Sequence, residues 1–183
     1  MGRFVLQKIK NVVGRDVFSL IRRKLTVVDV EMVYAAHGSD RWRRIRNEIK
    51  QKAIQDNNIP MLDWLFYRNV EFDFYDVCQA SRTGNLQTII WMSQHTDRYF
   101  EEAKNHVIHV AIDRGDVHVL DWIKSEKWHI ESGNFFYAIS CNQLTIIEWF
   151  VNNNVFNFSD QKECILESAR FYKQIYEYLN RVI

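Results

Sequence analysis

The chain has 183 residues, of which 47% are hydrophobic and 14% aromatic, with only six glycines and one proline. This length and composition exclude a disordered chain and a small domain that depends on disulfides, and they favour an ordered, helix-rich protein. Residues 1–52 carry thirteen basic and five acidic residues, a net charge of +8, whereas residues 53–183 carry eleven and eighteen, a net charge of −7. We therefore expect a basic N-terminal segment, residues 1–48, followed by an acidic helical body, residues 49–183.

The start of the chain is too charged for a signal peptide, and no apolar run approaches the roughly 18 residues that a membrane span needs. The three cysteines, Cys78, Cys141 and Cys164, are an odd number at wide spacing. This pattern favours free thiols over a disulfide framework or a zinc site. We expect a soluble, intracellular protein of the cytoplasm or nucleus with no cofactor.

The first predicted elements are two short helices within residues 12–45. The residues that mark them are Asp16, Val17, Phe18, Leu20, Ile21 and Leu25 in the first, Asp29 and Val30 at the start of the second, and Arg41 and Trp42 at its end. This pattern resembles an F-box. The resemblance implies docking on the adaptor subunit of a cullin-type ubiquitin ligase, with the remaining chain recruiting a substrate. The alternative is a plain helical cap that covers the apolar end of the first repeat.

A basic cluster follows at the end of this segment. Its members are Arg41, Arg43, Arg44, Arg46, Lys50 and Lys52. Clustered positive charge attracts phosphate, so nucleic-acid binding is one hypothesis. No RNA-recognition, zinc-finger or glycine-rich phosphate motif accompanies the cluster, and a solvated face or a contact with an acidic protein is the other.

The body of the chain contains an internal repeat. Residues 53–65, 80–92, 111–123 and 138–150 align without gaps, and their first residues lie 27, 31 and 27 positions apart. A period in this range is typical of a solenoid. Each segment carries an alanine and, eleven positions later, a tryptophan, and we expect these to pack between repeats. The expected repeat core is Ala53, Trp64, Ala80, Trp91, Ala111, Trp122, Ala138 and Trp149.

Each repeat contains a predicted boundary between two helices. Four residues after the alanine stands Asn or Gly, the residue types that tolerate the left-handed conformation at a helix end. The next residue is Asn58, Asn85, Asp116 or Gln143, and the first three are good N-caps for a second helix. Pro60 falls in the first turn of such a helix, where a missing amide hydrogen costs little.

The last segment, residues 168–179, fits the repeat only with a one-residue deletion. End repeats of solenoids are atypical because their outer face meets water. We interpret this segment as a C-terminal capping repeat. Its polar residues are Lys173, Gln174, Glu177 and Asn180.

The pattern of alanine, Asn or Gly four residues later, and a Leu-x-x-Ile-x-Trp-Leu helix resembles the divergent ankyrin-like repeats of giant DNA viruses and their protist hosts. The resemblance covers about residues 49–181, with a shorter period than standard ankyrin repeats and without their Thr-Pro-Leu-His motif. It implies an all-α solenoid of stacked helix-turn-helix ankyrin-like repeats with an N-terminal helical cap. It further implies a viral protein that binds a host or viral protein partner through its first helices. Exposed candidates on the first helix of the second repeat are Asp76, Gln79 and Arg82.

The sequence gives no positive sign of catalysis. His106 and His109 share one predicted helix, but no carboxylate or cysteine stands at a supporting spacing for a metal. Asp63, Asp121 and Glu148 each precede a repeat tryptophan, and this regularity favours helix solvation over a general acid or base. We expect no catalytic residues, no metal and no enzyme activity.

Overall fold

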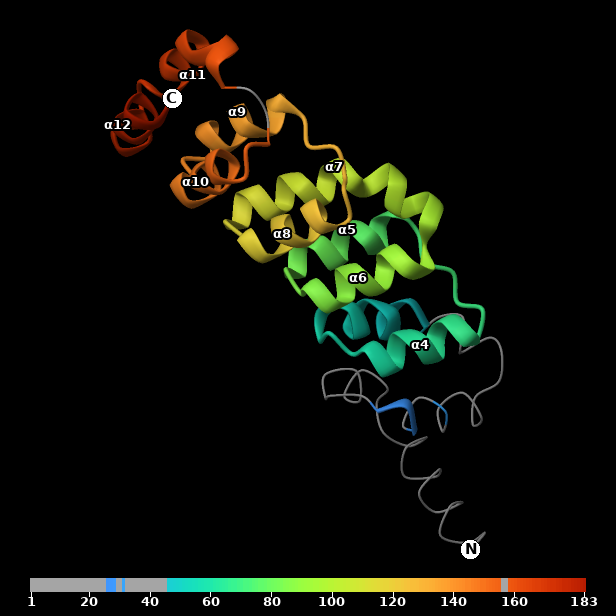
Figure 1. The fold of residues 1–183 in the computed structure, drawn as a ribbon. Helices are drawn as coiled ribbons and strands as arrows, with labels where there is room; N and C mark the ends of the chain where they lie inside the picture. The colour runs from blue at the N-terminus through green and yellow to red at the C-terminus, as the bar shows by residue number, and fades with distance from the viewer. Residues whose placement is uncertain (1–25, 29–30, 32–45, 156–157) are drawn as a thin grey trace, which may run out of the picture. The chain divides into compact units, whose positions relative to one another are not determined.

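The computed structural model describes residues 26–28, 31, 46–155 and 158–183, and every regular element among them is helical (Figure 1). The all-α class expected from the sequence is confirmed within these residues. Residues 46–55 form a helix ahead of the labelled elements. The labelled elements are α4 (Ile59–Tyr67), α5 (Phe74–Thr83), α6 (Leu86–His95), α7 (Asp97–Arg114), α8 (Val117–Ser125), α9 (Ser132–Ser140), α10 (Leu144–Asn152), the short 3-10 helix η1 (Ser159–Gln161), α11 (Lys162–Ala169) and α12 (Lys173–Val182).

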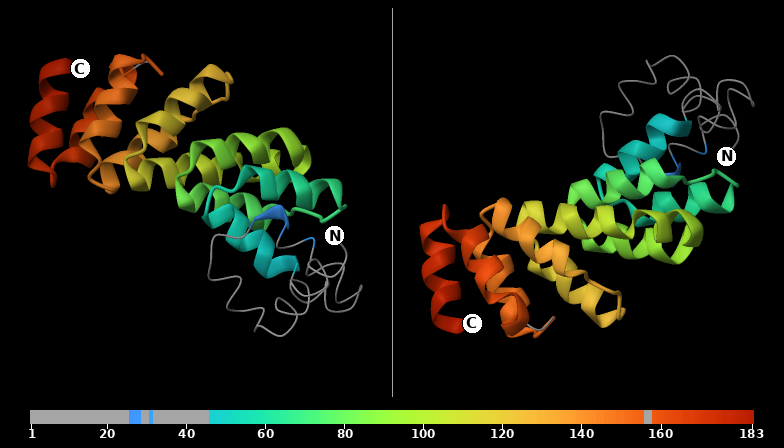
Figure 2. Two further views of the ribbon diagram at one scale, coloured as in Figure 1. Left: turned by 90° about the horizontal axis from the view of Figure 1, so that it is seen from below. Right: turned by 90° about the horizontal axis from the view of Figure 1, so that it is seen from above.

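The chain forms two compact units, residues 1–100 and residues 101–183, and the boundary falls inside α7. In the first unit the helix of residues 46–55 is followed by α4, and α5 packs on α6. In the second unit α9 packs on α10, and α11 packs on α12. Within each pair a short turn reverses the chain, as Figure 2 shows from two sides. The recurring structural element is therefore a pair of helices.

The turn inside four of these pairs is built around one residue with a left-handed backbone. Asparagine and glycine adopt this conformation at the lowest cost, so the first helix of each pair stops where the sequence predicts. The amide that follows the left-handed residue then bonds back to the repeat alanine in three of the pairs, which closes the turn. The left-handed residues are Asn57 (φ 53°), Gly84 (φ 70°), Gly115 (φ 67°) and Asn142 (φ 55°).

The second helix of a pair begins with a side-chain cap at two of the predicted positions. The Asn58 side chain accepts from the Met61 amide at 3.2 Å, and the Asp116 side chain accepts from the Val119 amide at 3.3 Å. Pro60 lies in the first turn of α4, as predicted. Both caps satisfy an amide that has no partner within the helix.

The second pair departs from this pattern. The predicted side-chain cap at Asn85 is wrong, because that side chain makes no cap hydrogen bond. Thr83 Oγ1 instead accepts from the Asn85 amide at 3.3 Å and donates to the Ala80 carbonyl at 2.7 Å. The hydroxyl therefore links the two backbone groups that bond directly in the neighbouring pairs.

The repeat alanines lie in the core, since Ala53, Ala80, Ala111 and Ala138 are each at most 3% exposed. Three of the four repeat tryptophans are also buried. Trp122 departs from the expected core position, because it is only half-buried. Its ring meets the ring of Trp128 edge-on at 4.9 Å, and Trp128 is itself half-buried, so part of this aromatic pair faces solvent.

The last helix pair, α11 and α12, buries apolar side chains and exposes charged ones. Ala169, Ile175 and Leu179 are fully buried, whereas the side chains of Lys173 and Glu177 are 88% and 63% exposed. The outer surface is not wholly polar, because Phe171 and Tyr176 are among the exposed aromatic residues.

Candidate functional site

The three candidate partner-binding residues on α5 differ in their exposure. Gln79 is half-buried and Arg82 is exposed, but Asp76 is only 1% exposed. The expected exposed position of Asp76 is therefore wrong. Its carboxylate closes the N-terminal cap of α5 and pairs with Lys50 from the helix of residues 46–55, and both contacts require it to point inward.

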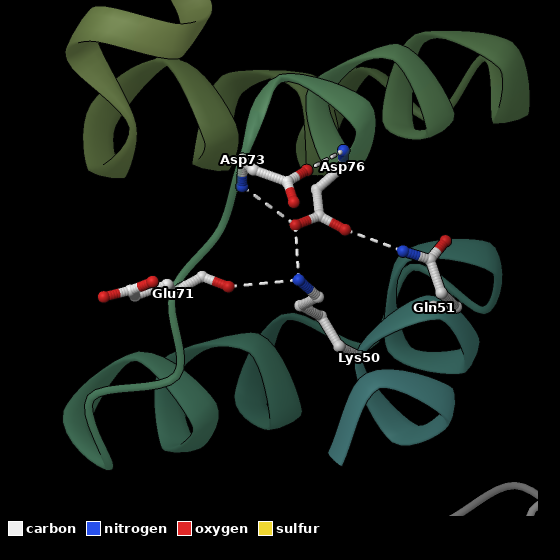
Figure 3. A network of polar contacts seen from close by, with 5 residues as sticks. All are labelled: Lys50, Gln51, Glu71, Asp73 and Asp76. Atoms are coloured by element: carbon white, nitrogen blue, oxygen red, sulfur yellow. Dashed lines mark hydrogen bonds and ion pairs between the residues drawn. The ribbon is translucent and has the colours of Figure 1, made fainter. Parts of the chain in front are cut away.

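Figure 3 shows the network around this carboxylate. Lys50 Nζ donates to Asp76 Oδ2 at 2.6 Å and to the carbonyl oxygen of Glu71 at 3.0 Å. Gln51 Nε2 donates to the other carboxylate oxygen, Oδ1, at 2.7 Å. The Asp73 amide donates to Asp76 Oδ2 at 2.9 Å, and Asp73 Oδ1 accepts from the Asp76 amide at 3.1 Å. The reciprocal pair is a capping box.

Burial has the largest influence on the pKa of Asp76 in this network. Burial raises the pKa of the Asp76 carboxyl, and the hydrogen bond and charge of Lys50 offset only part of that rise. Lys50 also lies 5.4 Å from the centre of the Phe72 ring. Because both charges are buried and bonded within the protein, we assign the pair a structural role, which is to hold the helix of residues 46–55 against α5.

The basic cluster is only partly within the described residues. Arg41, Arg43 and Arg44 lie outside them, and Arg46 is half-buried. Lys50 is engaged by Asp76, and Lys52 pairs with Asp56 at 2.6 Å. Both lysines of the cluster therefore have internal partners, which leaves less positive charge for phosphate.

Two repeat tryptophans make the same hydrogen bond to an acidic residue of an earlier repeat. Trp91 Nε1 donates to Asp63 Oδ1 at 2.7 Å, and Trp149 Nε1 donates to Asp121 Oδ1 at 2.7 Å. Each bond spans 28 residues, which is close to the sequence period. Helix solvation is therefore the wrong interpretation of these two acids. The sequence places each of these acids directly before a tryptophan, but the acid bonds to the tryptophan of the following repeat and not to its own neighbour.

Trp64 makes a similar hydrogen bond, but to an acid of the N-terminal segment. Trp64 Nε1 donates to Glu31 Oε1 at 3.0 Å, and the Arg68 guanidinium lies 3.8 Å from that carboxylate and 5.3 Å from the Trp64 ring. We use the name tryptophan–acid ladder for the hydrogen bonds that Trp64, Trp91 and Trp149 donate to these acids.

Most of the F-box-like pattern lies outside the described residues, and Glu31 is the described part of its second predicted helix. Its carboxylate touches the first repeat through Trp64.

In the second unit, a polar cluster lies on the first helices α7 and α9. The Asp113 carboxylate is exposed, and its Oδ1 accepts from the Tyr137 hydroxyl at 2.7 Å and from Cys141 Sγ at 3.3 Å. The His109 ring lies on the Tyr137 ring, with 4.7 Å between ring centres. Gln143 Nε2 donates to the Asp113 carbonyl at 2.8 Å. We call His109, Asp113, Tyr137 and Cys141 the Asp113 cluster.

The chemistry of this cluster argues against a nucleophile. Burial and the hydrogen bond to Asp113 raise the pKa of the Cys141 thiol, so the thiol stays protonated near neutral pH. The hydrogen bond to Asp113 raises the pKa of Tyr137 well above its ordinary value. Both groups therefore act as donors to the carboxylate. Among the described residues, no group of three or more His, Cys, Asp or Glu side chains is arranged to hold a metal ion.

The Asp113 cluster was not predicted from the sequence. Asp113 stands two residues after Ala111 and Tyr137 one residue before Ala138, so the two occupy facing positions on first helices of consecutive repeats. The positions of Asp113 and Tyr137 within their repeats can be taken from the sequence. Which side chain of one helix contacts which side chain of the next depends on how the helices pack. The sequence places His109 in a pair with His106, and the structure brings its ring into contact with Tyr137.

A pocket of about 400 Å³ lies between α11 and α12. Its carboxylate Glu167 is paired with Arg170. The lining carries no arrangement of a nucleophile with a base. The lining residues are Glu163, Leu166, Glu167, Arg170 and Tyr176.

Within the part of the chain that the structure describes, no helix is both long enough and apolar enough to cross a membrane. Comparison of the chain with protein-family models, with curated proteins and with solved structures gave no match.

Proposed function

We propose that this chain is a non-catalytic protein–protein interaction scaffold, a solenoid of stacked ankyrin-like repeats that binds its partner through the first helices. The observation that carries the proposal is the recurrence of one contact, the tryptophan–acid hydrogen bond, at Trp91 and Trp149 with a spacing of 28 residues. A stack of equivalent repeats produces equivalent contacts between neighbours, whereas an irregular helical domain does not.

The exposed side chains support first helices as the binding face. The repeat alanines and three of the four repeat tryptophans are buried, so they are not available to a partner. First helices keep polar side chains at the surface, among them Arg82 on α5 and Asp113 on α7. Residues of this kind vary without disturbing the stack, which is what a binding scaffold requires.

The N-terminal segment acts as a cap in this proposal. Glu31 supplies the acid that bonds to Trp64, in the way that Asp63 supplies the acid for Trp91. The resemblance to giant-virus repeats further leads us to propose a viral protein whose partner is a host or viral protein.

The test is an affinity pull-down with the full chain from an extract of protist cells, followed by direct binding measurements with each protein recovered. A matched pair of variants assigns the face: Gln79→Glu changes a first helix, and Gln94→Glu makes the same change on a second helix of the same unit. We expect Gln79→Glu to weaken binding by about tenfold through a like-charge or desolvation cost, and Gln94→Glu to leave it unchanged.

Equal binding by both variants, together with equal binding by Arg82→Gln, would contradict the first-helix face. Recovery of ligase adaptor subunits or of nucleic acid as the retained molecule would replace the scaffold proposal with one of the two alternatives.

A further inference from the structure

We propose that the Asp113 cluster on α7 and α9 is a binding site for an arginine side chain of a partner protein. This inference rests on the proposed scaffold function and names the chemistry that one part of its surface recognises. All of its residues belong to the second compact unit.

The first reason is a carboxylate that has no cation among the described residues. Asp113 is exposed, and no ion pair in the described part of the chain includes it. Its side-chain hydrogen bonds from Tyr137 and Cys141 both end on Oδ1. A carboxylate has about four lone-pair sites, so Oδ2 keeps its capacity to accept donors from outside the chain.

The second reason is that the carboxylate is held in place. Tyr137 and Cys141 fix one oxygen from α9, and Gln143 bonds to the backbone of Asp113 itself. A charge that is already oriented loses less conformational entropy when it binds than a free side chain does.

The third reason is that aromatic rings accompany the Asp113 carboxylate in this cluster. The His109 and Tyr137 rings contact each other at a tilt of 33°, with 4.7 Å between their centres. A guanidinium is planar, stacks on aromatic rings and donates two parallel hydrogen bonds to a carboxylate, whereas an ammonium is a strongly hydrated point charge. The combination of a carboxylate with adjacent rings therefore selects arginine over lysine and repels phosphate.

The site is tested by NMR titration of the full ¹⁵N-labelled chain with the peptide acetyl-Gly-Arg-Gly-amide. Two further peptides replace arginine with lysine or with citrulline, which keeps the shape of arginine but carries no charge. Asp113→Asn removes the charge and keeps an oxygen that can accept from Tyr137. Glu126→Gln is the matched control, because Glu126 is an exposed carboxylate in the same unit at the end of α8.

We expect saturable shifts of the amides around Asp113 and Tyr137 in the wild type and in Glu126→Gln, with affinity in the millimolar range that is usual for one side chain. Asp113→Asn and the citrulline peptide should each lower the affinity by about tenfold, which is the loss of one charge-assisted contact. The lysine peptide should bind more weakly than the arginine peptide.

Absence of saturable shifts, shifts confined to other regions, or equal affinity of the arginine and citrulline peptides would overturn the site. So would equal affinity of the wild type and Asp113→Asn. These failures leave the scaffold proposal intact if a recovered partner still depends on Gln79, because that residue lies on α5 in the other unit.

Discussion

The two compact units treat a first-helix carboxylate in opposite ways. In the first unit Asp76 is buried and its cation, Lys50, comes from the helix of residues 46–55. In the second unit Asp113 is exposed and receives only the neutral donors Tyr137 and Cys141. A carboxylate that is buried together with its cation has a structural role, whereas an exposed carboxylate without a cation among the described residues can accept donors from another molecule. The comparison therefore contrasts a structural acid with the acid that we propose as a binding site.

The largest effect is expected from removing the cation of the buried pair. Lys50→Met leaves Asp76 as a buried carboxylate without a counter-charge, and we expect the free energy of unfolding to fall by about 3 kcal/mol. Urea denaturation at neutral pH measures this loss. The double variant Lys50→Met/Asp76→Asn removes both charges and should recover more than half of it. A double variant as unstable as the single one would show that the loss comes from packing.

The pH dependence of the free energy of unfolding tests whether burial or the Lys50 pair dominates at Asp76. Because burial holds the pKa of Asp76 above its ordinary value of 3.8, the folded protein binds this proton more tightly than the unfolded chain does. The contribution to folding is full below pH 3.8 and is lost as the pH rises through the pKa of the folded state. We expect the stability of the wild type relative to Asp76→Asn to decrease from acid to neutral pH. An increase over that range would mean that the Lys50 pair outweighs burial.

The next effect concerns the tryptophan–acid ladder. A hydrogen bond to a charged acceptor contributes about 2 kcal/mol, so Trp91→Phe and Asp63→Ala should show a coupling energy of that size in a double-mutant cycle. Thermal or urea unfolding of the four proteins gives the value. Trp91→Phe with Asp56→Ala is the control cycle, because Asp56 pairs with Lys52 and not with the indole. A coupling energy near zero for Trp91 and Asp63 would mean that their hydrogen bond does not stabilise the fold.

A smaller effect is expected from the left-handed turns. Gly84 has a φ of 70°, and an alanine there should cost about 1 kcal/mol of stability. Gly84→Asn should lower the stability less, because Asn57 and Asn142 have the same left-handed conformation in the turns of other helix pairs. Gly133→Ala is the matched control: it lies inside α9 with no atom within 4 Å of the added carbon, so it should be neutral or stabilising. Equal losses at both glycines would argue against a conformational cause.

The smallest effect on stability belongs to Asp113. Its side chain is exposed and pairs with no cation among the described residues, so Asp113→Asn should change the free energy of unfolding by no more than about 0.5 kcal/mol. Urea denaturation of Asp113→Asn and Lys50→Met under the same conditions compares the two losses in the free energy of unfolding. A loss of similar size in the two variants would mean that both acids are structural.

The sequence alone determined the features that follow from local rules of the chain. The helix ends at Asn57, Gly84, Gly115 and Asn142 were predictable because only a few residue types adopt a left-handed backbone cheaply. The burial of the alanines was predictable because the period places them at one position of every pair.

Tertiary structure alone decided what each side chain meets. Asp76 and Asp113 are the same residue type on first helices, and nothing nearby in the sequence says that one faces Lys50 and the other faces Tyr137. Their partners lie 26 and 24 residues away, and the partner of Trp91 lies 28 residues away. Contacts over such distances depend on how helices far apart in the sequence pack within each unit, so burial, charge balance and the candidate site are properties of the tertiary structure.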